Sequence, residues 1–163
     1  MTSTTRHETQ IVADPDVPLV RITREFDAPP EKVFRAHTDP QLIVRWLGPR
    51  EAVMRLETWD CRTGGSWRYV SVHEGQEHAC RGTCHEVRPS ELIVQTFTFE
   101  GFPDGVALET MVFEDLGNGR TRMHASSLCD SFEGRDAWLA SGMETGVNEG
   151  YAKLDGLLAD GAV

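Results

Sequence analysis

Alternating apolar and polar positions fill the first three quarters of the chain. From Val17 to Phe26, the side chains of Val20, Ile22 and Phe26 fall on one face, which predicts a β-strand. Six further strands are predicted at 52–60, 66–73, 77–87, 91–100, 106–114 and 120–128. Short turns rich in Gly, Pro and Asn separate these segments, so we expect neighbouring strands to pair antiparallel.

Helical periods occur in two other places. Pro29 and Pro30 suit the first turn of a helix, and the residues after them predict two short helices, EKVFRAHT and QLIVRWLG. From about 135 to 159 the apolar residues repeat every 3.6 positions, which predicts one long amphipathic helix.

Three glycines lie at i, i+4 and i+8 along one flank of the predicted long helix. They are Gly142, Gly146 and Gly150. Because each glycine costs about 1 kcal/mol in a helix relative to alanine, we expect this flank to lie close to something. The sheet and a ligand in front of the sheet are the two alternatives.

The order of elements predicts an α+β protein. A seven-stranded curved antiparallel sheet would wrap around the long C-terminal helix, with two short helices after the first strand. Strands that curve away from a helix leave space where a pocket can form. We expect residues 17–160 to form a single ligand-binding domain, and residues 1–16, which are polar and lack a period, to form a flexible tail.

Composition excludes several classes of protein. The 163 residues include 16 Lys and Arg against 26 Asp and Glu, a formal charge of −10, which disfavours binding to nucleic acid. No stretch approaches the ~20 apolar residues of a membrane span, and the first residues lack the pattern of a secretion signal. We therefore expect a cytoplasmic protein. Residues 130–160 hold seven acids and two bases, which predicts a solvated helix face or a docking surface for a basic partner.

The cysteines and short motifs predict no cofactor. Cys80 and Cys84 stand four residues apart in a predicted strand, about 13 Å at 3.3 Å per residue. That separation is too long for one zinc ion or a disulfide, so we predict free thiols and no metal. The sequence has no phosphate loop, dinucleotide motif or nucleophile with an adjacent base.

Several segments resemble one superfamily. They are ITREFDAPPEKVFRAHTDP, RWLGP, DCRTGGSWRYV, RGTCHEVRPSELIVQTFTFE, TMVFEDLGNGRTRMH and ASGMETGVNEGYAKLDGLL. In this order they resemble the START-like (SRPBCC) superfamily, nearest to the C-terminal domain of the activator of heat-shock protein 90 ATPase. The resemblance implies the helix-grip fold with a cavity between sheet and helix. Superfamily members carry lipids, sterols or plant hormones, cyclise polyketides, or assist the chaperone.

Arg24 is the most unusual residue of the predicted core. It falls in phase with Ile22 and Phe26, so its guanidinium must find acceptors inside the protein. One interpretation is a structural ion pair, for which Glu109 and Glu144 are the candidate partners. The other is a hook that holds an anionic or carbonyl group of a ligand.

Aromatic side chains supply most of the other candidate ligand contacts. Trp67 and Tyr69 share one face of their strand, and both offer an apolar body with one polar atom. Packing in the core would place them equally well. The full set of predicted ligand-binding residues is Arg24, Trp46, Trp67, Tyr69, Phe97, Glu109, Met111, Met143, Glu144, Val147 and Tyr151.

Three functional hypotheses follow. The first is a non-catalytic binding protein for a small hydrophobic or amphipathic molecule, whose polar or anionic group Arg24 would anchor. The second is a polyketide-cyclase or dehydratase-like enzyme that uses Glu144, Glu109, Tyr69 or Arg24, marked by a pocket carboxylate of raised pKa. The third is a co-chaperone-like module that docks through the acidic C-terminal helix. A homodimer is left open.

Overall fold

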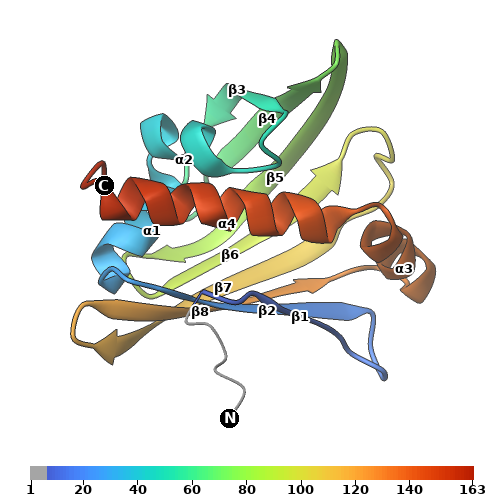
Figure 1. The fold of residues 1–163 in the computed structure, drawn as a ribbon. Coiled ribbons are helices and arrows are strands. Elements are labelled where there is room, and N and C mark those ends of the chain that lie inside the picture. Colours follow the sequence, from blue (N-terminus) through green and yellow to red (C-terminus); the bar gives the residue numbers. More distant parts are fainter. Residues whose placement is uncertain (1–6) are drawn as a thin grey trace.

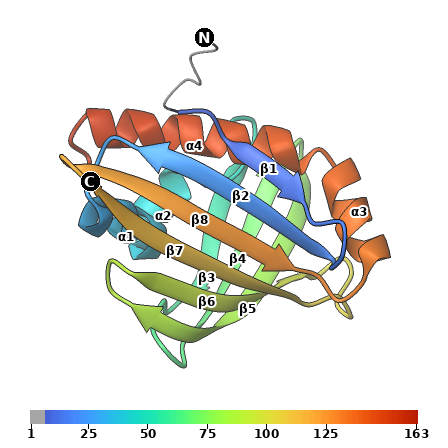
Figure 2. The same ribbon diagram turned by 90° about the horizontal axis from the view of Figure 1, so that it is seen from below.

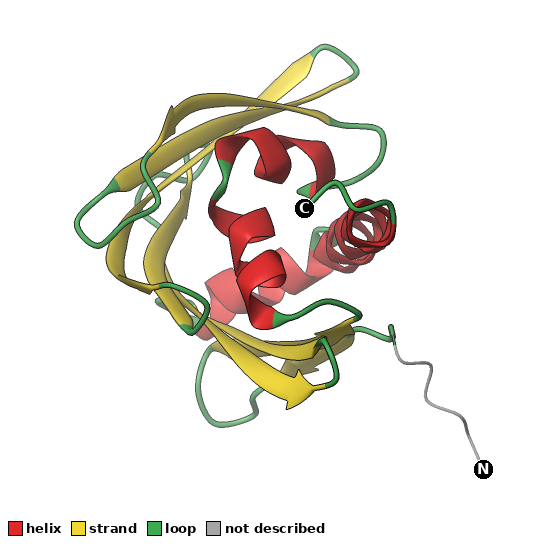
Figure 3. Ribbon diagram, turned by 90° about the vertical axis from the view of Figure 1, so that its left-hand side faces the viewer, coloured by secondary structure: helices red, strands yellow, loops and turns green. Residues whose placement is uncertain are grey.

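Eight antiparallel strands form a single sheet, one more strand than the sequence predicts. The computed structural model describes residues 7–163, and the sheet curves around the helices on its concave side (Figures 1 and 3). The strands are β1 (Gln10–Ala13), β2 (Leu19–Phe26), β3 (Val53–Trp59), β4 (Ser66–His73), β5 (Gln76–Arg88), β6 (Leu92–Phe99), β7 (Ala107–Gly117) and β8 (Arg120–Leu128). Their order across the sheet is β1-β2-β8-β7-β6-β5-β4-β3.

The additional strand, β1, corrects the prediction of a flexible tail over residues 1–16. Gln10 pairs with Thr23 and Ala13 with Val20, so β1 lies beside β2 at one edge of the sheet (Figure 2). The apolar pattern did not reveal this strand because it has four residues, of which Ile11 alone is partly buried. Residues 1–6 of the predicted tail lie outside the described residues.

Strand register brings inward-facing side chains from separate strands into rows. Ile22 of β2 pairs with Ala125 of β8, which pairs with Met111 of β7, which in turn pairs with Ile93 of β6. Side chains of directly paired residues lie on the same face of a sheet. This apolar row therefore crosses four strands and faces the helices.

The helices begin and end at residues that suit their ends. They are α1 (Pro30–Thr38), α2 (Pro40–Trp46), α3 (Phe132–Ala140) and α4 (Met143–Ala159). The single helix predicted from 135 to 159 is therefore two helices. Gly142 precedes α4 with φ of 85°, a left-handed conformation that breaks a helix and that glycine adopts readily. The apolar period runs through this break, which is why the pattern did not reveal it.

Helix α4 crosses the concave side of the sheet and packs on the end of α2 (Figure 1). A Cβ atom on Gly150 would lie 3.1 Å from the Trp46 carbonyl oxygen, and one on Gly146 would lie 3.6 Å from Pro49 Cδ. The glycine flank thus approaches the segment that follows α2, rather than the sheet. Tyr151 and Leu154 of α4 join the core, where the Tyr151 ring meets Phe26 edge-on at 5.4 Å.

None of the helices in the described residues is both long and apolar enough to cross a membrane.

Candidate functional site

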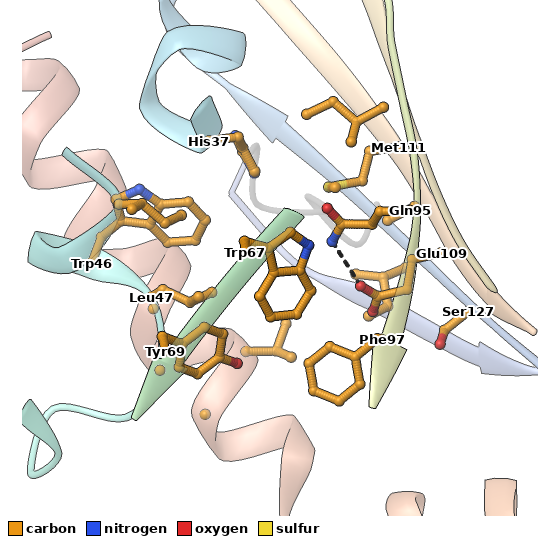
Figure 4. A pocket seen from close by; sticks show the side chains of 18 of the residues that line it. His37, Trp46, Leu47, Trp67, Tyr69, Gln95, Phe97, Glu109, Met111 and Ser127 are labelled. Atoms are coloured by element: carbon orange, nitrogen blue, oxygen red, sulfur yellow. Dashed lines mark hydrogen bonds between the residues drawn. The ribbon is translucent and has the colours of Figure 1, made fainter. Parts of the chain in front are cut away.

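A cavity of about 200 Å³ lies between the concave face of the sheet and helices α2 and α4. The apolar row of the sheet forms its floor, and side chains from α2 and the first turns of α4 close it from above (Figure 4). Most of its surface is apolar. Of the predicted ligand-binding residues, eight line it: Trp46, Trp67, Tyr69, Phe97, Glu109, Met111, Val147 and Tyr151.

Aromatic rings form one wall of this cavity. The Trp67 ring stacks on Tyr69, with centroids 5.6 Å apart and planes 14° apart, and lies 5.8 Å from the Phe97 ring. All three side chains come from strands β4 and β6, and Figure 4 shows them gathered at one end of the site. A flat apolar molecule could pack against such a wall.

A polar row crosses the floor beside the apolar one. Ser127 of β8 pairs with Glu109 of β7, which pairs with Gln95 of β6. Gln95 Nε2 donates a hydrogen bond of 3.0 Å to Glu109 Oε1 (Figure 4). Burial raises the pKa of Glu109, and the Gln95 hydrogen bond opposes that rise. Glu109 is enclosed by the protein, and its exposed surface faces the cavity.

The tyrosine hydroxyls near Glu109 stay protonated. Burial raises the pKa of both Tyr69 and Tyr151 above the usual range, with a smaller contribution from the Glu109 charge. Neither hydroxyl is therefore prepared to act as a base at neutral pH.

His37 is a lining residue that the sequence analysis missed. It lies in α1 and is 8% exposed, and its ring meets Trp46 and Phe113 edge-on, at 4.8 and 5.4 Å. Burial lowers the pKa of His37 to about 4, so the ring is neutral at pH 7. His37 stands four residues after Val33, so helical spacing puts both on one face of α1, but nothing in the sequence places that face against a cavity. Trp59, Gln95, Ser127 and Trp138 were also missed.

Arg24 is buried, as its phase in the strand indicates, but it does not line the cavity. Its NH1 and NH2 groups donate to the two carboxylate oxygens of Asp155 at 2.8 and 2.7 Å. The predicted partners Glu109 and Glu144 are therefore wrong, and so is the hook for a ligand. Asp155 of α4 thus meets Arg24 of β2, a contact between elements far apart in the sequence.

Two other predicted ligand contacts lie outside the cavity lining. Met143 is half-buried and packs against the core, and Glu144 is exposed to solvent. Both stand in the first turn of α4, just after the break at Gly142.

The lining residues contain no Lys or Arg, so the cavity offers no fixed positive charge. Within the described residues, no group of three His, Cys, Asp or Glu side chains is placed to hold a metal ion. The arrangement can therefore enclose an apolar molecule and offer hydrogen bonds, and Glu109 is the one acidic group within reach of it.

Comparison with known families agrees with this architecture. Residues 27–159 match the family model described as "Activator of Hsp90 ATPase homolog 1-like protein". The chain belongs to this family. The matched region includes all four helices and every strand except β1 and β2, and thus nearly all of the cavity.

Solved structures show the same START-like, helix-grip fold. A protein from Rhodobacter sphaeroides is 28% identical, with a TM-score of 0.82 over 93% of this chain and 98% of its own. A protein from Arthrobacter aurescens is 26% identical, with a TM-score of 0.84 over 93% and 91%. A protein from the dynemicin biosynthetic locus, 23% identical, shares the fold alone, with a TM-score of 0.67 over 90% of this chain and 49% of its own. None of the curated proteins matches the chain.

Proposed function

We propose that this member of the Hsp90 ATPase activator-like family binds one small, mostly apolar molecule in the cavity and does not transform it. The observation that carries the proposal is the space of about 200 Å³ with aromatic and aliphatic walls. Ligand pockets usually measure roughly 300–1,000 Å³, and this space is smaller, so its occupant must be a small molecule.

The charged groups of the lining disfavour an anionic ligand. An anionic group would meet Glu109 and no lysine or arginine, because the guanidinium of Arg24 is already paired with Asp155. Burying an unpaired charge is costly, so an anion has no favourable place in this site. A ligand without an anionic group therefore replaces the ligand expected from the sequence, whose anionic group Arg24 would anchor.

Native mass spectrometry with a small aromatic probe tests the proposal. We expect 2-naphthol to bind with one molecule per chain, and Ala125→Leu to abolish binding, because the longer side chain projects from the cavity floor into the space. Ala152→Leu, the same change on the exposed face of α4, serves as the matched control and should bind normally. Equal binding by both variants would contradict the proposal. The same spectra give the number of chains in the assembly.

An acid–base enzyme of the cyclase or dehydratase kind is the second candidate. The observation in its favour is Glu109, a pocket carboxyl with a raised pKa that could transfer a proton to an enclosed substrate. Of the other proposed groups, Glu144 and Arg24 lie outside the cavity lining, whereas Tyr69 lines it. If the protein is an enzyme, Glu109→Gln should remove turnover of a cyclisable substrate and leave 2-naphthol binding intact. Turnover that survives this change would exclude the mechanism.

A co-chaperone-like role has less support from the side chains. Asp155 of the acidic helix is paired with Arg24, and Glu149 accepts a hydrogen bond of 2.7 Å from the Arg50 amide. These two carboxylates are thus engaged within the protein. Pull-down with an Hsp90-type chaperone at low and moderate salt tests the role, and a complex that weakens with salt would support it.

Cytoplasmic location remains part of the proposal. All four cysteines are free, which is compatible with a reducing compartment.

A further inference from the structure

Two buried polar atoms on the cavity lining have no hydrogen-bond partner among the described residues. They are Nε2 of His37 and Nε1 of Trp67, in side chains that are 8% and 3% exposed. Buried polar groups in folded proteins are almost always paired, because an unpaired one loses its hydrogen bonds to water without replacement. Two such atoms in one cavity therefore call for a polar partner inside it.

The unpaired nitrogen of His37 is an acceptor. Its Nδ1 lies 2.7 Å from the carbonyl oxygen of Val33, which can only accept, so the ring hydrogen is on Nδ1. Since the low pKa of His37 leaves the ring neutral at pH 7, Nε2 then carries a lone pair. The edge-on contacts with Trp46 and Phe113 hold the ring in this orientation.

Trp67 presents a donor, because an indole N–H can only donate. Its ring is stacked on Tyr69 and covers Gly82, where an added Cβ atom would lie 2.6 Å from the ring carbon Cζ2. The ring therefore cannot turn its nitrogen toward another partner. Figure 4 shows the nitrogen on the side of the ring that faces Gln95.

We infer that His37 and Trp67 select the ligand through one acceptor and one donor. This inference rests on the binding function proposed above and names its substrate class. The ligand is an uncharged molecule with a flat apolar body, a hydroxyl or N–H group that donates to His37 Nε2, and an oxygen that accepts from Trp67 Nε1. Phenols, alcohols and amides meet this description. Carboxylates do not, because neither a carboxylate oxygen nor His37 Nε2 has a hydrogen to share.

A series of three naphthalenes separates the two hydrogen bonds. Naphthalene has neither polar group, 2-methoxynaphthalene can only accept, and 2-naphthol can donate and accept. Isothermal titration should show affinity rising along this series, with 2-naphthol binding about tenfold or more tightly than naphthalene, the ratio that one or two net hydrogen bonds supply.

Two variants test which side chain is responsible for each gain in affinity along the series. His37→Phe keeps an aromatic ring but loses the acceptor, so 2-naphthol should bind no better than 2-methoxynaphthalene. Trp67→Phe loses the donor, so 2-methoxynaphthalene should bind no better than naphthalene. His124→Phe is the matched control for the histidine change, because His124 is exposed on β8 and does not line the cavity. It should leave both ratios unchanged.

The outcomes distinguish the inference from the proposal on which it rests. Binding of all three probes with equal affinity would overturn the inference and keep the cavity as a binding site, with ordered water satisfying the two atoms. Failure of every probe to bind would overturn both. Each ratio compares probes on the same protein, so a loss of stability in a variant does not alter it, and the wild-type series decides the matter even if a variant fails to fold.

Discussion

Arg24 is a charged residue in the core, and its ion-pair partner shows that its role is structural. The side chain is 4% exposed and makes a two-pronged ion pair with Asp155, while its guanidinium carbon lies 5.0 Å from the Phe26 ring centre. These contacts tie β2 to α4. Arg24 therefore stabilises the position of α4 over the cavity and does not contact a ligand.

Removal of one partner should expose this structural role. Asp155→Ala leaves the guanidinium buried and unpaired, and we expect a loss of about 3 kcal/mol in the free energy of unfolding, measured by urea denaturation. Arg24→Met combined with Asp155→Leu should recover most of the loss, because it removes both charges together. Loss of 2-naphthol binding with unchanged stability in Asp155→Ala would show instead that Arg24 serves the ligand.

His37 should make stability depend on pH. Its pKa is 6.5 when unfolded and about 4 when folded, so between these values the unfolded chain binds the proton more strongly. This contribution to stability is complete above pH 6.5 and is lost as pH falls to 4, by about 3 kcal/mol in total. Urea denaturation of the wild type and His37→Phe across this range isolates the contribution, because other groups are common to both. A stability difference that stays constant with pH would contradict the assignment.

At the scale of elements, the close approach of α4 to the end of α2 shapes the roof of the cavity. Gly150 backs onto the carbonyl of Trp46, and the Trp46 ring both lines the cavity and lies 5.9 Å from the Tyr151 ring. A side chain at position 150 would push these helices apart. The glycine thus keeps the aromatic roof over the site.

Two alanine substitutions on the same helix test this approach. Gly156 has open space around its Cβ position, so Gly156→Ala should stabilise the protein by about 0.5–1 kcal/mol through helix propensity. Gly150→Ala gains the same propensity but crowds the Trp46 backbone. We expect it to be at least about 1 kcal/mol less favourable than Gly156→Ala in thermal or urea unfolding. Equal effects would mean that the helices are not in tight contact.

Elements long enough to show a repeating pattern of apolar residues could be predicted from the sequence, and the others could not. The seven longer strands and the two short helices follow the alternation of apolar residues closely. Strand β1 has one half-buried side chain, and the break at Gly142 depends on a backbone angle of 85°, which a periodic pattern does not record.

The candidate site was partly predictable for a related reason. Inward-facing strand residues such as Trp67 and Glu109 could be assigned from their phase. The partner of Arg24 and the cavity-facing edge of His37 depend on how distant elements meet, which one chain's local pattern does not encode.

At the scale of the whole molecule, the curved sheet and the helix that crosses it leave a space that side chains do not fill. The floor is apolar apart from the row of Ser127, Glu109 and Gln95, and the walls are aromatic. The sheet and the helices around this space form the START-like, helix-grip fold that the chain shares with solved structures. The side chains of this chain determine which molecules the cavity would accept.

Nuclear magnetic resonance of the four tryptophan indole N–H groups tests the central claim most directly, that a small uncharged molecule enters this cavity. Trp46 and Trp59 already donate to the carbonyls of Ala36 and Thr38, whereas Trp67 Nε1 has no partner, so of these three signals the Trp67 signal should move most when 2-naphthol is added. The Trp67 signal, assigned with Trp67→Phe, should shift to saturation at one molecule per chain in the wild type and stay unmoved in Ala125→Leu. A Trp67 signal that does not shift, or that shifts equally in Ala125→Leu, would contradict the account.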